Sequence, residues 1–364
     1  MKIAGRITNA INGIVLLVFL LIGAGLVLLI YISTSTPSNE QTEIVPDSFV
    51  PTPQRDLRLD AFREQWNIRG DFQEWPALIP LAKISEAAYD LEPANRSIVE
   101  PFGFDEIQKI ESPFHSQVAY IISGEDVMVI AFRGTDEGED WLTNAGVYLR
   151  QMDLGKIHSG FSTAYSTLRP TVLDAVEYHR PKYLWITGHS LGGALAVVCA
   201  HDLTLFHNLE LSGVITFGQP MIGNRDFTES LQERVGDRFV HFCNGLDAVP
   251  HTPLGLKHCG CLIWFKDGKI RKSANYLQLP VSAGPGQSPD PSEYEPIDEL
   301  PPLSRRQMEE FKQTYDGDKD EPQKVMGAPP TSAPPRSSIL DRVPWKADHD
   351  MDRYLEKLEG YYQK

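Results

Sequence analysis

The stretch YLWITGHSLGGALAVVCA, residues 183–200, changes character at a single serine. Residues 183–187 are apolar and β-forming, which predicts a short buried strand. Residues 191–200 are mostly Leu, Ala and Val, which predicts a helix. Ser190 lies at the junction between the two, where a serine most often serves as a helix N-cap.

Glycines stand two residues before and two residues after this serine, at Gly188 and Gly192. An N-cap does not account for them, but the spacing G-x-S-x-G, with His189 and Leu191 as its variable positions, is typical of a nucleophile elbow. Such a strand-to-helix turn strains the serine backbone, so neighbouring side chains must be nearly absent. The unpaired N–H groups at the helix N-terminus would stabilise negative charge on a substrate oxygen. The sequence therefore favours Ser190 as a nucleophile.

The composition of the 364 residues is that of an ordinary globular protein, with 41% hydrophobic and 23% charged residues. The formal net charge of −15 argues against a nucleic-acid partner. The four cysteines, Cys199, Cys243, Cys259 and Cys261, lack metal-ligand spacing, so we expect no metal site. On one strand, Cys259 and Cys261 would lie about 6.7 Å apart, at the limit for a disulfide, while a bridge from either to Cys243 is an alternative outside the cytosol.

The N-terminal segment has the composition of a membrane span. Residues 14–32 are nearly continuous Ile, Leu, Val and Phe, and at about 1.5 Å per residue such a helix approaches the roughly 30 Å hydrocarbon core of a bilayer. Lys2 and Arg6 precede it and no basic residue follows until Arg55, so the positive-inside rule predicts a cytosolic N-terminus. We expect residues 1–32 to be a single-pass membrane anchor, with the catalytic domain on the non-cytosolic side. Secretion after signal-peptide cleavage is the alternative.

Beyond a tether at residues 33–53, which is rich in Ser, Thr and Pro, strand and helix patterns alternate. A hairpin is expected around Asp267-Gly268. The alternation predicts an α/β fold, with a mostly parallel central sheet and flanking helices, in a domain that covers residues 54–364. The expected strands are 118–122, 127–132, 183–187, 214–217 and 239–243, and the expected helices lie at 77–89, 168–176, 191–200 and 227–235.

Residues 280–335 interrupt this pattern. They hold 12 of the 27 prolines, and residues 285–325 carry 11 acidic and 5 basic side chains, a net charge of −6. Only residues 303–315 look helical. We interpret the segment as a solvated insert within the domain, because residues 339–362 again have the pattern of folded structure.

A nucleophilic serine needs a histidine base, and the base needs an orienting carboxylate. In folds with this elbow, the acid and then the base follow the nucleophile along the chain. Asp247 comes just after the expected strand 239–243, at the end of the strand where parallel sheets carry their functional loops. His349 precedes an expected helix and is our candidate base. His251 is the rival base, but the prolines around it bias its segment towards an extended path.

The second oxyanion donor is expected from an earlier junction of strand and loop. The sequence AFRGT, residues 131–135, ends the strand 127–132. The backbone N–H of Thr135 would supply this donor, and the N–H of Leu191, directly after the nucleophile, would supply the other.

Several segments together resemble the class 3 lipases, an α/β-hydrolase family of triacylglycerol lipases and related esterases. They are AFRGT with DWLTNAG, IHSGFSTAY, GHSLGGALA, TFGQPMIGN, VHFCNGLDAVPHTP, LIWFKDGKI and DHDMDRY, in the order of the family. The resemblance covers roughly residues 77–362 apart from the insert, and it implies the α/β-hydrolase fold. It implies the same five site residues: Ser190 as nucleophile, Asp247 as acid, His349 as base, and Thr135 and Leu191 as the oxyanion hole.

The resemblance also implies a lid at residues 136–147, in which Trp141 and Leu142 are the candidates for lipid contact. It implies neither a metal nor an organic cofactor. The long acidic insert and the N-terminal anchor depart from the family pattern, which affects substrate access and location rather than chemistry.

We therefore expect a membrane-anchored serine ester hydrolase that acts on acyl lipids, triacylglycerol or another acylglycerol, through an acyl-enzyme. A phospholipase, or an esterase of soluble esters such as feruloyl sugars, is an alternative within the same chemistry. An alternative of another class is a catalytically inactive anchored scaffold that presents the acidic insert to partners. The full set of catalytic candidates argues against the scaffold.

Overall fold

The computed structural model describes residues 56–64, 72, 75–113, 117–135, 148–273, 294–297, 300–304, 306, 307, 309 and 348–362. The chain divides into two compact units, Met1–Arg55 and Asp56–Lys364. The expected membrane anchor at 1–32 and the tether at 33–53 lie outside the described residues. Of the helices that the structure does describe, none is long and apolar enough to cross a membrane.

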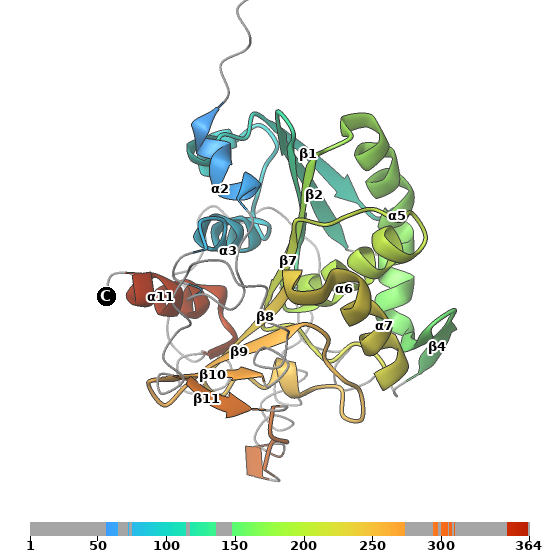
Figure 1. The fold of residues 1–364 in the computed structure, drawn as a ribbon, viewed down its shortest axis with the longest axis vertical. Coiled ribbons are helices and arrows are strands. Elements are labelled where there is room, and N and C mark those ends of the chain that lie inside the picture. The colour runs from blue at the N-terminus through green and yellow to red at the C-terminus, as the bar shows by residue number, and fades with distance from the viewer. Residues whose placement is uncertain are drawn as a thin grey trace, which may run out of the picture. The chain divides into compact units, whose positions relative to one another are not determined.

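A mixed sheet of nine strands is the framework of the described part of the second unit (Figure 1). Its strands lie in the order β1-β2-β3-β6-β7-β8-β9-β10-β11. Every neighbouring pair from β3 to β9 is parallel, and the antiparallel pairs lie towards the two edges. The expected mostly parallel central sheet is therefore confirmed. The strand bounds are β1 Glu106–Glu111, β2 Val118–Gly124, β3 Val127–Phe132, β6 Tyr183–His189, β7 Gly213–Phe217, β8 Phe239–Asn244, β9 Cys261–Lys266, β10 Lys269–Ser273 and β11 Tyr294–Ile297.

Helices cover both faces of this sheet, because its central strands are buried on both sides. In β3, Val129 and Ala131 pack into one core while Ile130 and Phe132 pack into the other, as the two-residue period of a strand requires. One face carries α2, α3 and α11, and the other carries α5, α6 and α7 (Figure 1). The helix bounds are α2 Asp60–Arg63, α3 Leu78–Ala87, α5 Ser159–His179, α6 Leu191–Leu205, α7 Arg225–Val235 and α11 Met351–Tyr362.

The segment around the serine folds as its sequence predicts. The strand expected at 183–187 runs two residues further as β6, and the helix expected at 191–200 continues to Leu205 as α6. The expected hairpin joins β9 to β10, where Asp267 and Gly268 have positive φ angles of 52° and 73°. The sequence patterns do not predict four of the described strands: β1, β11, and the pair β4, Leu149–Met152, and β5, Gly155–His158, which forms a separate sheet.

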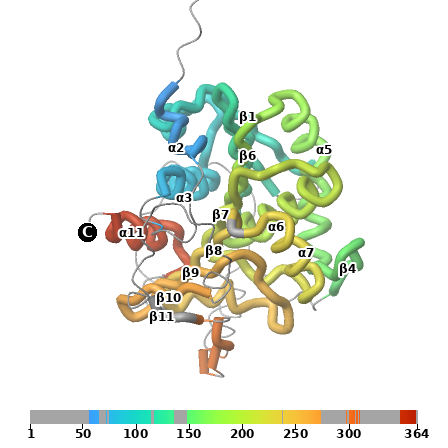
Figure 2. The backbone as a smooth tube through the Cα atoms, viewed as in Figure 1, coloured from blue at the N-terminus to red at the C-terminus, as the bar shows by residue number. Residues whose placement is uncertain are grey.

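Part of the proline-rich segment joins the sheet, which corrects its interpretation as a solvated insert. Tyr294–Ile297 form β11, which pairs in parallel with β10 at the edge of the sheet (Figure 2). Leu300 is buried against Leu262 and Trp264. The segment therefore supplies apolar contacts as well as charge. Most of the helix expected at 303–315 lies outside the described residues.

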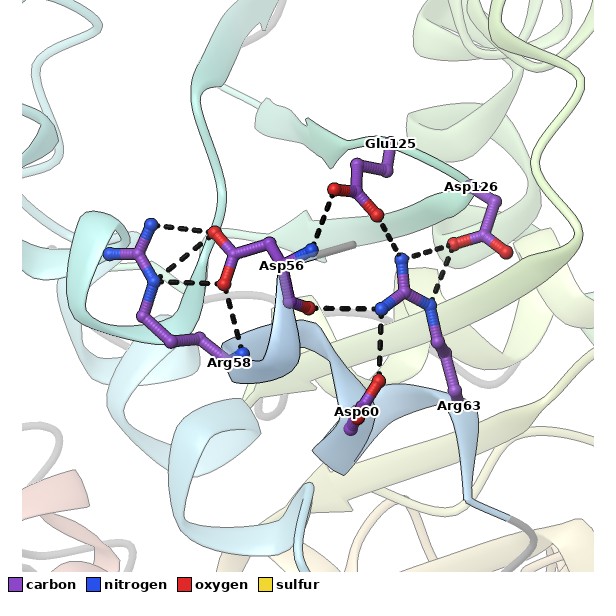
Figure 3. A network of polar contacts seen from close by, with 6 residues as sticks. All are labelled: Asp56, Arg58, Asp60, Arg63, Glu125 and Asp126. Atoms are coloured by element: carbon purple, nitrogen blue, oxygen red, sulfur yellow. Dashed lines mark hydrogen bonds and ion pairs between the residues drawn. The ribbon is translucent and has the colours of Figure 1, made fainter. Parts of the chain in front are cut away.

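One arginine holds the start of the second unit to the turn between β2 and β3 (Figure 3). Nε of Arg63 donates to Oδ1 of Asp126 at 2.8 Å, Nη1 donates to Oδ1 of Asp60 at 3.0 Å, and Nη2 pairs with Glu125. The side chain of Arg63 is only 6% exposed, so these three carboxylates compensate a charge that has little access to water. The network fixes α2 against the hairpin from which β3 runs towards the serine.

All four cysteines are buried, and none of them forms a disulfide: Cys199, Cys243, Cys259 and Cys261. The alternative of a disulfide among the last three is therefore not realised in this structure. Cys199 and Cys259 lie in one of the two apolar cores and Cys261 lies in the other, where a thiol packs as a small apolar group.

Candidate active site

Ser190 lies at the turn where β6 ends and α6 begins. Its backbone has φ 56° and ψ −128°, a combination that residues other than glycine rarely adopt. Two glycines make this turn sterically possible. A Cβ on Gly188 would lie 2.4 Å from the carbonyl oxygen of Gly192, and a Cβ on Gly192 would lie 2.2 Å from that of Phe132. The local geometry is that of a nucleophile elbow.

His349 brings an imidazole to this serine from a position 159 residues further along the chain. Its Nε2 lies 2.9 Å from Ser190 Oγ, and its Nδ1 lies 2.9 Å from Asp247 Oδ2. Because an ionised carboxylate can only accept, Nδ1 carries the proton, and Nε2 is left to accept from the serine hydroxyl. The structure therefore brings the expected nucleophile, base and acid into one hydrogen-bonded series.

Asp247 lies in the loop after β8, and its side chain is fully buried. Its Oδ1 accepts from the N–H of Val249 at 2.9 Å, and its Oδ2 accepts from the hydroxyl of Tyr354 at 2.6 Å as well as from His349. Burial and the adjacent Asp247 raise the pKa of Tyr354 well above its ordinary value, so its hydroxyl stays protonated and donates. The carboxylate is thus held in one orientation by three donors.

Asp348 ties the segment of the histidine to the loop that carries the acid. Its carboxylate accepts from the N–H of Leu246 at 2.7 Å, and its carbonyl accepts from Nδ2 of Asn244 at 3.1 Å. Neither Asp348 nor Tyr354 is predicted from the sequence to be a site residue. Tyr354 did carry a signal, since it lies on the apolar face of the expected final helix and a buried tyrosine hydroxyl needs a partner. Asp348 carried no such signal.

The two expected oxyanion donors belong to the elbow itself and to the segment that follows β3. Leu191 is the first residue of α6, so its N–H belongs to the turn in which helical N–H groups have no acceptor within the helix. Thr135 follows a segment that passes close to the elbow, because a Cβ on Gly134 would lie 2.9 Å from the carbonyl oxygen of His189. The end of β3 and the N-terminus of α6 therefore meet at Ser190.

His251 follows Asp247 closely in sequence but does not join this series. Its ring lies against Trp264, with 6.4 Å between the ring centroids, and within the part of the chain that the structure describes its Nδ1 has no hydrogen-bond partner. Burial lowers the pKa of His251, which disfavours the imidazolium form. The structure places His349, and not His251, against Ser190.

The expected lid at 136–147, with Trp141 and Leu142, lies outside the described residues. The two residues that follow it, Tyr148 and Leu149, are 75% and 39% exposed. Among the described side chains, no group of three or more His, Cys, Asp or Glu residues is arranged to hold a metal ion. The described site holds a serine, an imidazole and a buried carboxylate in one hydrogen-bonded series, an arrangement suited to acyl transfer.

Comparison with known proteins finds a family model, described as Lipase (class 3), that matches residues 129–257. This segment includes Ser190 and Asp247 and ends before His349. Over 128 residues the chain is 32% identical to the secreted mono- and diacylglycerol lipase LIP1 of Malassezia globosa, which covers 33% of this chain and 42% of that protein. Over 154 residues it is 30% identical to the chloroplastic phospholipase A(1) DAD1 of Arabidopsis thaliana, which covers 36% of this chain and 34% of that protein.

Among solved structures, the native Rhizomucor miehei lipase propeptide complex matches with a TM-score of 0.47 and 26% sequence identity, over 54% of this chain and 69% of that one. The chain spans less than half the length of the first curated relatives that it matches.

Proposed function

Because this chain belongs to the class 3 lipase family, we propose that it hydrolyses carboxylic esters of acyl lipids with Ser190 as the nucleophile. The observation that carries the proposal is the hydrogen-bonded series from Asp247 through His349 to Ser190 at a strained strand-to-helix turn. The relatives named as mono- and diacylglycerol lipases support acylglycerols as the substrate class. The whole protein is proposed to need no metal and no organic cofactor.

In the first half of the reaction, Ser190 Oγ attacks the carbonyl carbon of the ester while Nε2 of His349 takes the hydroxyl proton. Asp247 stabilises the imidazolium that results. The N–H groups of Thr135 and Leu191 bind the negative charge that develops on the carbonyl oxygen, and the loss of one such donor would raise the barrier by about 3 kcal/mol. His349 then protonates the leaving alcohol, and the acyl group stays on Ser190.

In the second half, water takes the place of the alcohol. His349 removes a proton from the water as its oxygen attacks the acyl carbonyl, and the same two N–H groups bind the new oxyanion. Collapse of this intermediate returns the proton to Ser190 Oγ and releases the fatty acid. One ester and one water yield one acid and one alcohol, and the site returns to its starting state.

Hydrolysis of p-nitrophenyl esters of increasing acyl chain length tests this proposal. We expect release of p-nitrophenol by the purified protein, with medium and long chains preferred over acetate because an acyl-lipid site binds apolar chain. A serine-directed phosphonate should abolish the release and should be found on Ser190 by mass spectrometry. Turnover of acetate alone would favour the soluble-ester alternative. No turnover of any ester would refute the hydrolase and favour the scaffold.

A phospholipase is the second candidate, because one relative of similar identity is named a phospholipase A(1). Mixed micelles that contain diacylglycerol and phosphatidylcholine in equal amounts separate the two substrates. Faster release of fatty acid from diacylglycerol would favour the lipase, and faster release from phosphatidylcholine would favour the phospholipase.

Lipid contact by Trp141 and Leu142 in the proposed lid at 136–147 should make activity depend on aggregated substrate. Side chains that are shielded in water would contact the substrate surface when the lid opens. We expect the rate on a short-chain triacylglycerol to rise several-fold as its concentration passes the solubility limit, and Trp141→Ala to reduce that rise, with Tyr178→Ala, an exposed aromatic outside the lid, as the control. A smooth saturating curve that is the same for all three proteins would contradict the lid.

Residues 1–32 are proposed to anchor the protein in a membrane, with the catalytic unit on the non-cytosolic side. The secreted alternative has its own support, since several relatives are named secreted lipases. We expect the full chain in the membrane fraction, with its catalytic unit digested by protease added to intact spheroplasts. Recovery from the medium of a chain that lacks residues 1–32 would establish the secreted form instead, and protection from external protease would contradict both.

A further inference from the structure

The backbone of the base is held by another histidine. Nε2 of His189, the residue before the nucleophile, lies 2.7 Å from the carbonyl oxygen of His349. Because a carbonyl oxygen only accepts, Nε2 of His189 carries a proton and donates it to this bond. The two imidazole rings are in contact in a tilted arrangement, with their centroids 4.6 Å apart and an interplanar angle of 33°. His189 therefore contacts both the main chain and the side chain of His349.

Tyr89, just beyond the C-terminal end of α3, contacts the other ring nitrogen of His189. Its hydroxyl lies 2.7 Å from Nδ1 of His189. With the proton on Nε2, Nδ1 is an acceptor, so the tyrosine hydroxyl donates to it. The result is a directed chain of two hydrogen bonds, from Tyr89 through His189 to the carbonyl of His349.

Burial keeps this chain in one state. His189 is 4% exposed, and burial together with the neighbouring His349 ring holds its pKa well below the ordinary value. The imidazole is therefore neutral at physiological pH, as a donor on one nitrogen and an acceptor on the other requires.

The same tyrosine also reaches the strand end that precedes the expected oxyanion loop. A Cβ on Gly134 would lie 2.1 Å from the hydroxyl oxygen of Tyr89. The side chain of Tyr89 thus packs against the residue before Thr135. Three segments converge on the site, namely the end of β3, the elbow and the segment of His349, and Tyr89 contacts the first two.

The base needs such support because of where it lies in the chain. His349 follows a connection that is long in sequence. The entropy of closing a long loop changes little with its length, so many end positions cost nearly the same. The connection itself therefore does not specify where the histidine lies. Asp348 binds the loop of the acid, and the carbonyl of His349 binds the elbow through His189. With both contacts in place, the backbone of the base is fixed relative to the acid and to the nucleophile.

We propose that His189 and Tyr89 are positioning residues of this hydrolase, which hold the main chain of His349 so that its imidazole meets Ser190 and Asp247 together. The inference rests on the proposed function, since it concerns the rate of the same reaction. A displacement of the base by about 1 Å lowers a rate by about a hundredfold. The contacts touch neither substrate nor reacting atoms, so their loss should reduce kcat and leave KM nearly unchanged.

Two substitutions at one position separate positioning from packing. His189→Leu fills the space but removes both hydrogen bonds, whereas His189→Gln keeps an N–H that donates and an oxygen that accepts. On a soluble ester such as p-nitrophenyl butyrate, we expect His189→Leu to lower kcat about 30- to 100-fold and to keep KM within about twofold of wild type. We expect the kcat of His189→Gln to be about tenfold higher than that of His189→Leu. His201→Leu is the matched control, because His201 is an equally buried histidine whose ring packs on Phe227 in the opposite core.

A second test uses the tyrosine, and it stays informative even if His189→Leu folds poorly. Tyr89→Phe should lower kcat about five- to tenfold in the wild-type background and by less than about twofold in the His189→Leu background, because the two residues act through one chain. Thermal unfolding of each variant separates loss of fold from loss of rate.

Turnover by the wild-type protein, combined with kcat values for His189→Leu and Tyr89→Phe that match the His201→Leu control, would overturn the inference and leave the hydrolase intact. Equal losses in His189→Leu and His189→Gln would overturn it as well, because shape rather than hydrogen bonding would then matter. A wild-type protein without any turnover would refute the proposed function itself.

Discussion

His349→Ala is expected to lower kcat for a soluble ester by about three orders of magnitude or more, whereas His251→Ala should change it little. The reason is geometric. Nε2 of His349 lies 2.9 Å from Ser190 Oγ and its other nitrogen bonds the buried carboxylate of Asp247, while His251 lies against Trp264. Without the imidazole, the serine hydroxyl has no group to take its proton.

The two alanine variants control for each other, since each removes one imidazole from the neighbourhood of the acid, half-buried in His349 and buried in His251. Circular dichroism should show that both fold, and kcat should be measured on a p-nitrophenyl ester below its solubility limit, so that lid opening plays no part. A folded His349→Ala variant with near-wild-type kcat would show that the base is misassigned. A comparable loss in His251→Ala would do the same.

Asp247→Asn is expected to lower kcat by about three to four orders of magnitude while the fold persists. All three partners of the carboxylate are donors: the N–H of Val249, the ring of His349 and the hydroxyl of Tyr354. An amide NH₂ cannot accept from any of them, so the contact with Val249 is lost in one orientation of the side chain, and the contacts with both His349 and Tyr354 are lost in the other. When the NH₂ faces the ring, His349 adopts the other tautomer and directs an N–H at the serine, so that it can no longer act as a base.

The exposed Asp226 at the start of α7 provides the matched control, since Asp226→Asn makes the same chemical change away from the carboxylate network. We expect this control to keep the wild-type kcat. A rate within about tenfold of wild type would mean that Asp247 does not set the tautomer.

The sequence predicts those parts of the site that depend on local geometry. Gly188 and Gly192 flank Ser190 because their Cβ atoms would collide with the backbone across the turn, and such a requirement is visible as a spacing. Asp247 is predictable because the C-terminal ends of parallel strands carry the functional loops. The burial of β3 is visible as an unbroken apolar run.

The parts that were missed depend on contacts between segments far apart in the chain. Tyr89 and His189 are 100 residues apart and look like ordinary helix and elbow positions until the fold brings them together. Asp348 reads as one acid in an acidic stretch, although its carboxylate bonds Leu246. The strand Tyr294–Ile297 was missed because prolines and acidic residues surround it, and its pairing with β10 overrides that local composition.

The way in which His349 is held also bears on how this enzyme can diverge. The contacts that fix its segment run to Asn244, Leu246 and His189, all of which precede the last residue of β10. The connection between β10 and the base can therefore be lengthened after Leu300, which itself packs against Leu262 and Trp264, without retuning the chemistry, and an engineer could place a reporter domain in that later stretch.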